Sequence, residues 1–372
     1  MATAGEPRVH RGSRARALRP SGSATLRDVA GVAGVSIATV SRILTGARPS
    51  APATRTRVLA AAAQLEYRPS ALARALKLQQ SLTLGLLVTD IENPYFPELV
   101  RAVEDAAHLA GYAVLLCNAT DDPDRELAYL NLLLERRVDG IIVAASRVGA
   151  RHAALLLRAA VPVVLVNSEA PRSGLSSIAS DNRQGGRLAT ELVLGLGHRG
   201  IAHITAPAAN AAATQRLAGA RDALRSAGLL PETLRVVEGN AHVSGGESAT
   251  REVVARYPEV TAIVCYNDLT AIGALRALRA AGRRVPHDVS VVGFDDIDPS
   301  SWTDPPLTTV AQDKQEMGRW AFATLTRAMD ASGRYSPRTR RLPTELVVRG
   351  STAPPPGADP ATRIRTRRAT IA

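Results

Sequence analysis

Basic residues are the most chemically suggestive feature of this chain, because they are concentrated at one end. Residues 1–80 carry 13 arginines and lysines against 3 aspartates and glutamates, a balance of +10. Residues 81–356 carry 29 against 30, so the net charge of +12 arises mainly in the first fifth of the chain. Such a concentration of cations binds phosphates, so we expect a nucleic acid partner. Residues 8–19 fit a solvated tail, whereas the basic residues from 25 to 77 alternate with apolar ones at helical spacing.

Motifs typical of an enzyme are not found in the sequence. It has no glycine-rich loop for phosphate, no nucleophile elbow, and no cluster of histidines and cysteines at metal-ligand spacing. Cys117 and Cys265 each end an apolar run, as small buried hydrophobic residues do. His198 lies in a Gly-His-Arg turn and is interpreted as structural. We therefore expect no enzymatic activity, no catalytic residue, no metal and no cofactor.

Two short helices joined by a glycine turn are predicted within the basic segment. Thr25 and Asp28 have the spacing of a capping box at the start of the first helix. Gly34 can adopt the left-handed conformation that ends this helix, and Ser36 can cap the second. The apolar stripe that crossed helices bury is supplied by Val29, Ala33, Val35, Val40, Ile43 and Leu44. This pattern is typical of a helix-turn-helix, whose second helix enters the major groove of DNA.

From residue 82 the chain alternates strand-length apolar runs with longer helical patterns, as in parallel sheets with crossover helices. The expected strands are Thr83 to Val88, Ala113 to Cys117, Gly140 to Ala144, Val163 to Val166, Ile201 to Thr205, Ala262 to Tyr266 and Val289 to Phe294. Helical patterns include Phe96 to Ala110, Arg125 to Glu135, Asn182 to Leu196, Arg216 to Ala227, Gly246 to Tyr257 and Asp268 to Ala280. So many strands indicate two half-domains, with ligand sites at the carboxyl ends of the strands.

A series of segments between residue 25 and residue 352 carries a recognisable pattern. It begins with TLRDVAGVAGVSIATVSRILTG and TRTRVLAAAAQLEYRPSALARALK, and continues through LGLLVTDIENPYF, RVDGIIV, SDNRQGG, LGHRGIAHI, QRLAGARDAL, DVSVVGFDD, PPLTTV and LPTELVVRGST. These segments closely resemble the lactose and purine repressor family of bacterial transcription regulators. The resemblance implies an N-terminal all-α helix-turn-helix headpiece with a hinge helix, followed by a two-lobed α/β sensor domain with parallel sheets, like periplasmic sugar-binding proteins. It also implies a homodimer that binds a palindromic operator.

The resemblance divides the chain into segments with different roles. Residues 1–23 and 353–372 are expected to be disordered basic tails, 24–68 the DNA-binding domain, 69–80 the hinge helix, and 81–352 the effector-binding and dimerisation domain. The first lobe is expected at about 82–182 and 305–330, and the second at about 183–304 and 331–352. The dimer is expected to lie along the helix at 96–110.

In the headpiece, the resemblance places base contacts on the front of the second helix. The positions there are Ser36, Ile37, Ala38, Ser41 and Arg42, while Thr39, Thr45, Arg48, Thr54 and Arg55 are expected to contact the DNA backbone. Thr25, at the start of the first helix, is a further expected DNA-binding position. Ile37 and Ala38 can read only apolar features such as a thymine methyl. Arg42 either donates to a guanine or clamps a phosphate, and both interpretations stay open.

The hinge segment resembles a family helix that folds only when two copies meet over the minor groove. A helix this short is unstable alone in water, so coupling its folding to DNA is physically reasonable. Leu76 aligns with the leucine that relatives insert between base steps, and Ala73 lets the two helices approach closely. Leu72 and Leu76 would otherwise be interpreted as core residues, but the adjacent basic residues favour insertion.

In the sensor domain, the resemblance implies an effector cleft between the lobes. The matching positions are Asp90, Asn93, Phe96, Asn167, Asp181, Arg216, Asn267 and Asp295, and Phe96 or Trp302 could cover an apolar ring. These residue types suit a polyhydroxylated ligand. Helix or loop capping by Asp181 and Asp295, and an interlobe salt bridge from Arg216, stay open as alternatives. Ala241 stands where relatives often carry a stacking aromatic residue, so their ligands are not transferable. A sugar or sugar phosphate is the first expectation, and a nucleobase or nucleoside the second.

Two other functions compete with that of a regulator. An enzyme lacks its motifs, and a transport-linked solute-binding protein would leave residues 25–77 without a purpose and would need a secretion signal. The N-terminal arginines lack the apolar core of a signal peptide, and no apolar run approaches the roughly 18 residues that span a bilayer. We therefore predict a cytoplasmic, nucleoid-associated repressor with no membrane contact, whose operator affinity changes with a small metabolite. Whether the metabolite is an inducer or a corepressor stays open.

Overall fold

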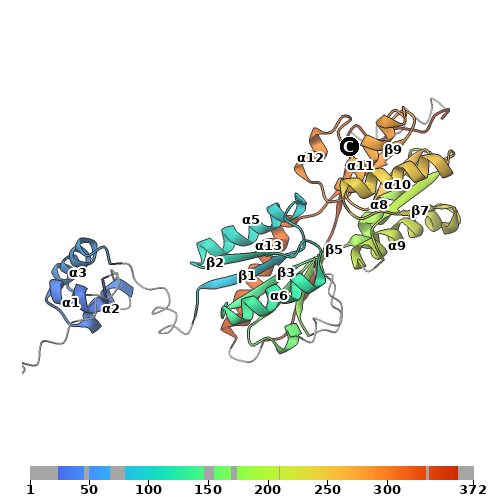
Figure 1. Cartoon of the computed structure of the whole chain (residues 1–372). Helices are drawn as coiled ribbons and strands as arrows, with labels where there is room; N and C mark the ends of the chain where they lie inside the picture. Colours follow the sequence, from blue (N-terminus) through green and yellow to red (C-terminus); the bar gives the residue numbers. More distant parts are fainter. Residues whose placement is uncertain are drawn as a thin grey trace, which may run out of the picture. The chain divides into compact units, whose positions relative to one another are not determined.

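The computed structural model describes residues 24–45, 50–67, 80–145, 155–168, 174–208, 210–331 and 335–358. The chain divides into two compact units, Met1–Ser81 and Leu82–Ala372 (Figure 1). Three residues expected to contact DNA, Arg48, Ala73 and Leu76, lie outside the described residues, as does nearly all of the expected hinge. Among the described residues, no helix combines the length and apolar character needed to cross a membrane.

The first unit is a bundle of three helices, α1 (Leu26–Ala33), α2 (Ile37–Thr45) and α3 (Pro52–Gln64). Thr25 and Asp28 form the predicted capping box, and Gly34 ends α1 in the left-handed conformation with φ of 63°. The core of the bundle consists of Val29, Ala30, Ala33, Val40, Ile43, Val58, Ala61 and Ala62. The predicted helix-turn-helix is confirmed, and α3 supplies the third wall of its core.

The first lobe of the second unit contains a six-stranded parallel sheet in the order β11-β5-β4-β3-β1-β2. Its strands are β1 (Thr83–Val88), β2 (Ala113–Asn118), β3 (Gly140–Ala144), β4 (Val163–Val166), β5 (Ser176–Ser180) and β11 (Thr339–Leu342). Helices α5 (Tyr95–Leu109) and α13 (Lys314–Asp330) pack on one face, and α6 (Pro123–Glu135) packs on the other (Figure 1). Strands β3 and β4 are buried along their whole length, because helices cover both faces.

The second lobe contains a four-stranded parallel sheet in the order β7-β6-β8-β9. Its strands are β6 (Ile201–Thr205), β7 (Arg235–Glu238), β8 (Ala262–Cys265) and β9 (Ser290–Val292). Helices α8 (Asn182–Gly195) and α9 (Ala211–Ser226) cover one face, and α10 (Val243–Arg256) and α11 (Asp268–Ala280) cover the other. The helix pair α8 and α9 packs closely because Gly186 lies between them: a Cβ at Gly186 would lie 2.1 Å from the carbonyl oxygen of Arg216.

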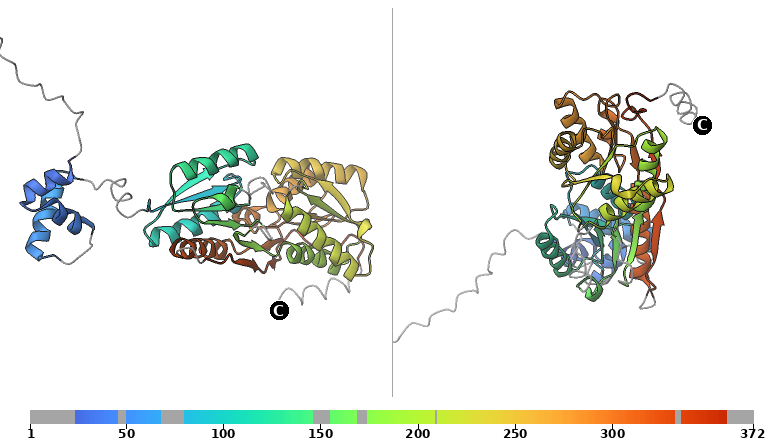
Figure 2. Two further views of the ribbon diagram at one scale, coloured as in Figure 1. Left: turned by 90° about the horizontal axis from the view of Figure 1, so that it is seen from below. Right: turned by 90° about the vertical axis from the view of Figure 1, so that its right-hand side faces the viewer.

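Shorter elements complete the second lobe. They are the 3-10 helix η1 (Pro231–Thr233), helix α12 (Asp298–Trp302), and the antiparallel pair β10 (Thr309–Ala311) and β12 (Glu345–Val347). Figure 2 shows the two lobes of the second unit side by side. Both cysteines, Cys117 and Cys265, are free and buried, as predicted.

The expected lobe boundaries are partly wrong. Strand β10, expected in the first lobe, pairs with β12 and forms an isolated bridge from Asp295 to Ala311 in the second lobe. Strand β11, expected in the second lobe, is the edge of the first-lobe sheet through its pairing with β5. Among the described residues, the chain therefore passes between the lobes near residues 181, 312 and 343. The error arises because these short strands lack the apolar runs that mark the others.

The predicted start of the C-terminal tail is also wrong. Residues 353–358 belong to the described structure, and the carbonyl oxygen of Ala353 accepts hydrogen bonds from Nε2 of His198 at 2.8 Å and from Ser290 at 3.0 Å. The other ring nitrogen of His198 lies 2.9 Å from the hydroxyl of Thr261. His198 therefore connects the C-terminal end of the domain to the second lobe. This contact agrees with the prediction that His198 has a structural role.

Candidate functional site

The front of α2 presents the predicted base-contacting residues on the surface of the first unit. Ile37 is 43% exposed, and Ala38 and Arg42 are also exposed. The hydroxyl of Ser36 accepts a hydrogen bond from the backbone N–H of Thr39 at 3.1 Å, so Ser36 caps the helix. Nε of Arg42 donates to the carbonyl oxygen of Ala38 at 3.2 Å. This bond lays the guanidinium along the exposed front of α2. Ser41, one of the predicted base contacts, is only partly exposed there.

Two further helix starts in the first unit carry predicted DNA-binding residues, Thr25 at α1 and Thr54 and Arg55 at α3. The carboxylate of Asp28 accepts hydrogen bonds from both the backbone and the hydroxyl of Thr25, at 2.8 and 2.7 Å. These hydrogen bonds lower the pKa of Asp28. Arg55 is exposed and Thr54 partly buried in the first turn of α3. Thr45 is described only as the last residue of α2. Helix starts with free N–H groups are suited to phosphate oxygens.

In the second unit, a cavity lies where the carboxyl ends of the strands of both lobes meet. It is lined by Thr89, Asp90, Asn93, Tyr95, Phe96, Asp121, Ala145, Asn167, Asn210, Arg216, His242, Tyr266, Asn267 and Asp295. The structure thus brings together seven of the nine predicted effector residues, from segments far apart in the sequence. The lining is mostly polar, with carboxylates, amides and one guanidinium.

Two predicted effector residues do not line this cavity. Trp302 is 75% exposed on α12, so it is not available to cover a ring in the cavity. Asp181 accepts a hydrogen bond from the backbone N–H of Gln184 at 2.9 Å and is the N-cap of α8. Asp181 therefore has the alternative role that the sequence left open, that of a helix cap. Both assignments to the effector site are corrected.

Arg216 is the most buried charged group of the cavity, with a side chain 3% exposed. Its guanidinium donates to Oδ1 of Asn182 at 2.9 Å and to the carbonyl oxygen of Tyr266 at 2.6 Å. It also lies 3.5 Å from the centroid of the Phe294 ring and 4.7 Å from that of Tyr266. An ion pair of 3.5 Å joins it to Asp295 within the same lobe, so the expected interlobe alternative is wrong.

Asp295 is held in the second lobe beside the crossing segments. Its backbone has a φ of 114°, outside the range that L side chains usually adopt. Oδ1 of Asp295 accepts a hydrogen bond from Nε2 of Gln312 at 2.6 Å. Burial raises the pKa of the Asp295 carboxyl, while Arg216 and Lys314 oppose this effect. This strained backbone directs the Asp295 carboxylate toward Arg216. Asp295 therefore pairs with a charged side chain and does not cap a helix.

Asparagines from three strand ends face the same cavity. Asn267 caps α11 through Oδ1, which accepts from the backbone of Thr270 at 2.9 Å, and its Nδ2 donates to the carbonyl oxygen of Ala241 at 2.9 Å. Asn210 caps α9 and donates to the hydroxyl of Tyr266 at 2.8 Å. Oδ1 of Asn167 is buried without a hydrogen-bond partner. Because a buried acceptor without a partner is costly, Asn167 is available for a ligand hydroxyl.

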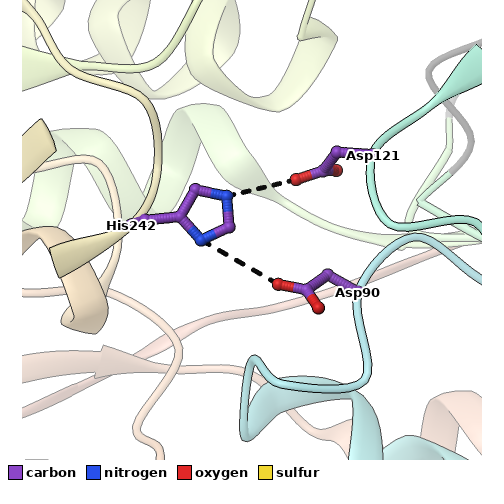
Figure 3. A group of neighbouring side chains, drawn as sticks. All are labelled: Asp90, Asp121 and His242. Carbon is purple, nitrogen blue, oxygen red and sulfur yellow. Dashed lines mark ion pairs between the residues drawn. The ribbon is translucent and has the colours of Figure 1, made fainter. Parts of the chain in front are cut away.

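Three side chains of the cavity lining make contacts from one lobe to the other (Figure 3). Nε2 of His242, from the second lobe, lies 3.3 Å from Oδ2 of Asp121 in the first lobe. Nδ1 of the same ring lies 3.9 Å from Oδ2 of Asp90. His242 and Asp121 were not predicted from the sequence.

The other lining residues that sequence reasoning missed are Thr89, Tyr95, Ala145, Asn210 and Tyr266. Most of them follow a strand closely, as Asp121 follows β2 and His242 follows β7. The rule that ligand sites lie at the carboxyl ends of parallel strands would have found them, had it been applied to every strand. His242 was missed because β7, the strand that precedes it, has the sequence RVVE and lacks the longer apolar run by which other strands were predicted.

These two units define a class of protein: a DNA-binding helix-turn-helix joined to a two-lobed α/β sensor with a polar cleft. Family models support each part. The model described as "Bacterial regulatory proteins, lacI family" matches residues 25–70, and "Periplasmic binding proteins and sugar binding domain of LacI family" matches residues 81–349. The chain belongs to the LacI family of bacterial regulatory proteins.

Similar proteins cover nearly the whole chain. The ribose operon repressor of Escherichia coli (strain K12) is 38% identical over 88% of this chain and 99% of that protein. The HTH-type transcriptional repressor PurR of Photobacterium profundum is 35% identical over 88% of this chain and 98% of that protein. The structure of the Lac repressor dimer bound to operator and the anti-inducer ONPF has a TM-score of 0.80 and 31% identity, covering 89% of this chain and all of that one (100%).

A sensor-domain structure is also similar. It is a LacI family transcriptional regulator from Enterococcus faecium with bound ribose, with a TM-score of 0.67 and 30% identity, covering 73% of this chain and 99% of that one.

Proposed function

We propose that this chain is a transcriptional repressor whose hold on operator DNA is controlled by a small polyhydroxylated molecule in the interlobe cavity. The observation that supports this most directly is the meeting of seven predicted polar and aromatic positions in one cavity between the lobes. The exposed front of α2, with Ile37 and Arg42, is the base-reading surface. The relatives named above are repressors, one of them described as bound to operator, which supports the same role here.

The charges of the cavity favour an uncharged ligand over a phosphorylated one. Asp90, Asp121 and Asp295 contribute three carboxylates, while Arg216 is the only arginine or lysine among the described lining residues. The Arg216 guanidinium is already committed to Asn182, to the Tyr266 carbonyl and to Asp295. A phosphate group would therefore be repelled by three carboxylates, while the guanidinium that could bind it is already engaged. We therefore narrow the effector to a neutral sugar or, second, a nucleoside; the ribose in the similar regulator supports this choice.

A second copy of the chain is the partner proposed for the edge of the first lobe. Strand β2 is an edge strand whose Leu115 and Leu116 are 38% and 40% exposed, and Leu109 at the end of α5 is 88% exposed. Apolar side chains gathered on an edge strand and the adjacent helix favour pairing with another chain. Changing Leu116 to Glu is expected to shift the protein from dimer to monomer in analytical ultracentrifugation. The matched change of the exposed Leu230, in the second lobe, leaves it dimeric.

Because a repressor acts on DNA, we expect this protein in the cytoplasm, at the nucleoid.

Closing the cleft moves the two lobes relative to each other, and linkage then changes operator affinity and ligand affinity reciprocally. A coupling of about 1 to 3 kcal/mol, or roughly 5- to 150-fold, is the usual size of such an effect.

In vitro selection of bound DNA, followed by retardation assays with a panel of small molecules, tests the proposal. The panel contains neutral pentoses and hexoses, their phosphates, and nucleosides. We expect a palindromic operator whose binding weakens steeply with salt, since phosphate contacts release counterions. At least one neutral compound should change its affinity, and its phosphate should act more weakly. Equal binding to palindromic and random DNA under every condition would rule out the proposed function.

A further inference from the structure

His242 lies between the lobes and faces two carboxylates of the opposite lobe (Figure 3). It precedes α10 in the second lobe, whereas Asp90 and Asp121 follow β1 and β2 in the first. Both contacts therefore exist only while the lobes are close together. The side chains of His242, Asp121 and Asp90 are 42%, 22% and 10% exposed, so the bridge lies at the edge of the cavity.

The two nitrogens of the ring face different carboxylates, Nε2 toward Asp121 and Nδ1 toward Asp90. A neutral imidazole has a single N–H and donates in one direction only, while an imidazolium has two. At 3.3 and 3.9 Å both contacts are at ion-pair distance, and only the charged ring is attracted to both carboxylates. One ligand atom from each of the three side chains lies within 4.8 Å of the others, close enough to surround an ion. A metal binds through one ring nitrogen, however, so the carboxylate that faces the other nitrogen would have to turn toward it. The observed arrangement therefore matches a bound proton better than a bound metal.

We propose that protonated His242 clasps the two lobes through Asp90 and Asp121, so that closing the cleft takes up a proton. A proton on His242 strengthens its attraction to both carboxylates, so linkage favours the closed arrangement at lower pH. Histidine side chains in general change charge between about pH 5 and 8, and this is the range to test. The effect of this clasp on the operator rests on the proposed function, but the clasp itself needs neither DNA nor effector.

The other titratable groups that line the cavity are Tyr95, Arg216, Tyr266 and Asp295. The phenols carry no charge near neutral pH, and Arg216 and Asp295 pair with each other at 3.5 Å. On its own side, the backbone N–H of His242 donates to the amide oxygen of Asn240 at 3.0 Å, which is neutral. Burial raises the pKa of Asp268, beneath the crossing segments, to about 8, so this group titrates in the same range. A test must therefore distinguish His242 from Asp268.

Pulsed electron paramagnetic resonance on the full chain measures the separation of the lobes directly. Spin labels are attached at Ala128→Cys on α6 and Ala255→Cys on α10, both exposed positions, while the native cysteines are buried. Labelled chains are mixed with excess unlabelled protein, so that distances between two labelled copies do not contribute. Measurements are made at about pH 5.5 and about pH 8.5, without DNA or ligand.

We expect a shorter mean separation at the acidic pH, and loss of this shift in His242→Gln, with the longer separation at both pH values. Asp121→Asn should reduce the shift, and the matched variant His287→Gln, at an exposed histidine of the same lobe, should keep it. Thermal melts verify that each variant is folded. Three results would overturn the proposal: equal separations in the wild type at both pH values, a shift that persists in His242→Gln, or a shift that appears only with added Zn²⁺ and disappears with EDTA.

Discussion

The ammonium of Lys314 lies 3.3 Å from Oε2 of Glu98 and also donates to the carbonyl oxygens of Asp295 and Asp296, at 2.8 Å each. Lys314 begins α13 in the first lobe and is 5% exposed, whereas the two carbonyls belong to the second lobe. Glu98 lies on α5, the helix beside the proposed dimer surface. Burial raises the pKa of Glu98, and Lys314 opposes this effect. Lys314 thus connects Asp295, the ion-pair partner of Arg216, to Glu98 on α5.

Replacing Lys314 with Met should destabilise the protein and weaken the coupling between effector and operator. The buried carbonyl of Asp295 and the partly buried carbonyl of Asp296 lose their donor, and an unsatisfied buried group costs about 1 to 3 kcal/mol. Chemical unfolding followed by circular dichroism measures the loss. Arg319→Met is the matched control on the exposed side of α13, where the pair with Glu316 should contribute less than about 1 kcal/mol. Equal stability losses in the two variants would contradict the role given to Lys314.

Changing Arg216 to Lys should abolish the effector response while leaving operator binding without effector intact. Lysine keeps a positive charge near Asp295, but it cannot reproduce the planar stack on Phe294 or the fork of hydrogen bonds. Arg216→Met should also lower the melting temperature, because a buried carboxylate without its partner costs about 3 to 5 kcal/mol. Retardation assays with and without the selected effector measure the response. Arg221→Lys, exposed on the same helix, is the control, and a normal response in Arg216→Lys would remove Arg216 from the site.

Acidification should destabilise the second lobe through His203. Burial lowers the pKa of His203 from 6.5 to about 4, and neither ring nitrogen has a hydrogen-bond partner. The unfolded chain therefore binds a proton first, so stability is complete above about pH 6.5 and is lost as the pH falls toward 4. At about 1.4 kcal/mol for each pKa unit, the loss approaches roughly 3 kcal/mol.

The variant His203→Leu tests this assignment, because leucine keeps the site apolar and does not titrate. Its melting temperature should fall less between about pH 7 and about pH 5 than that of the wild type. Burial also lowers the pKa of His198, so part of the pH dependence should persist. His287→Gln, at an exposed position, should behave like the wild type. An unchanged pH dependence in His203→Leu would show that another group is responsible.

Replacing Arg42 with Ala distinguishes the two interpretations of its role. A base contact predicts a loss of about 1 to 3 kcal/mol concentrated at one base pair of the operator. A phosphate contact predicts a similar loss on every sequence and a salt slope smaller by about one. Because the side chain lies along the exposed front of α2, we expect the first result. Arg55→Ala, at the start of α3, is the control that should show the second, and binding to a set of operator variants at several salt concentrations measures both.

The strands that sequence reasoning missed show where local pattern stops being informative. Strand β5, with sequence SSIAS, contains three serines and is nevertheless buried along its whole length, because it lies between β4 and β11. Strands β7 and β11 are edge strands rich in charged residues. Their strand character depends on pairing with a neighbouring strand, a tertiary context that the local sequence does not reveal.

The sequence by itself determined the helix-turn-helix and the alternation of parallel strands with helices. Both follow from local spacing: a capping box, a glycine at a left-handed turn, an apolar run of strand length. Seven residues of the cavity were named only through the resemblance to a known family. Only the tertiary structure decided that Arg216 pairs with Asp295 within one lobe, that Asp181 caps a helix, that Trp302 faces solvent, and that His242 meets Asp90 and Asp121. These relationships join segments far apart in the sequence or depend on which side chains the neighbouring elements cover. Spacing along the chain carries no information about either.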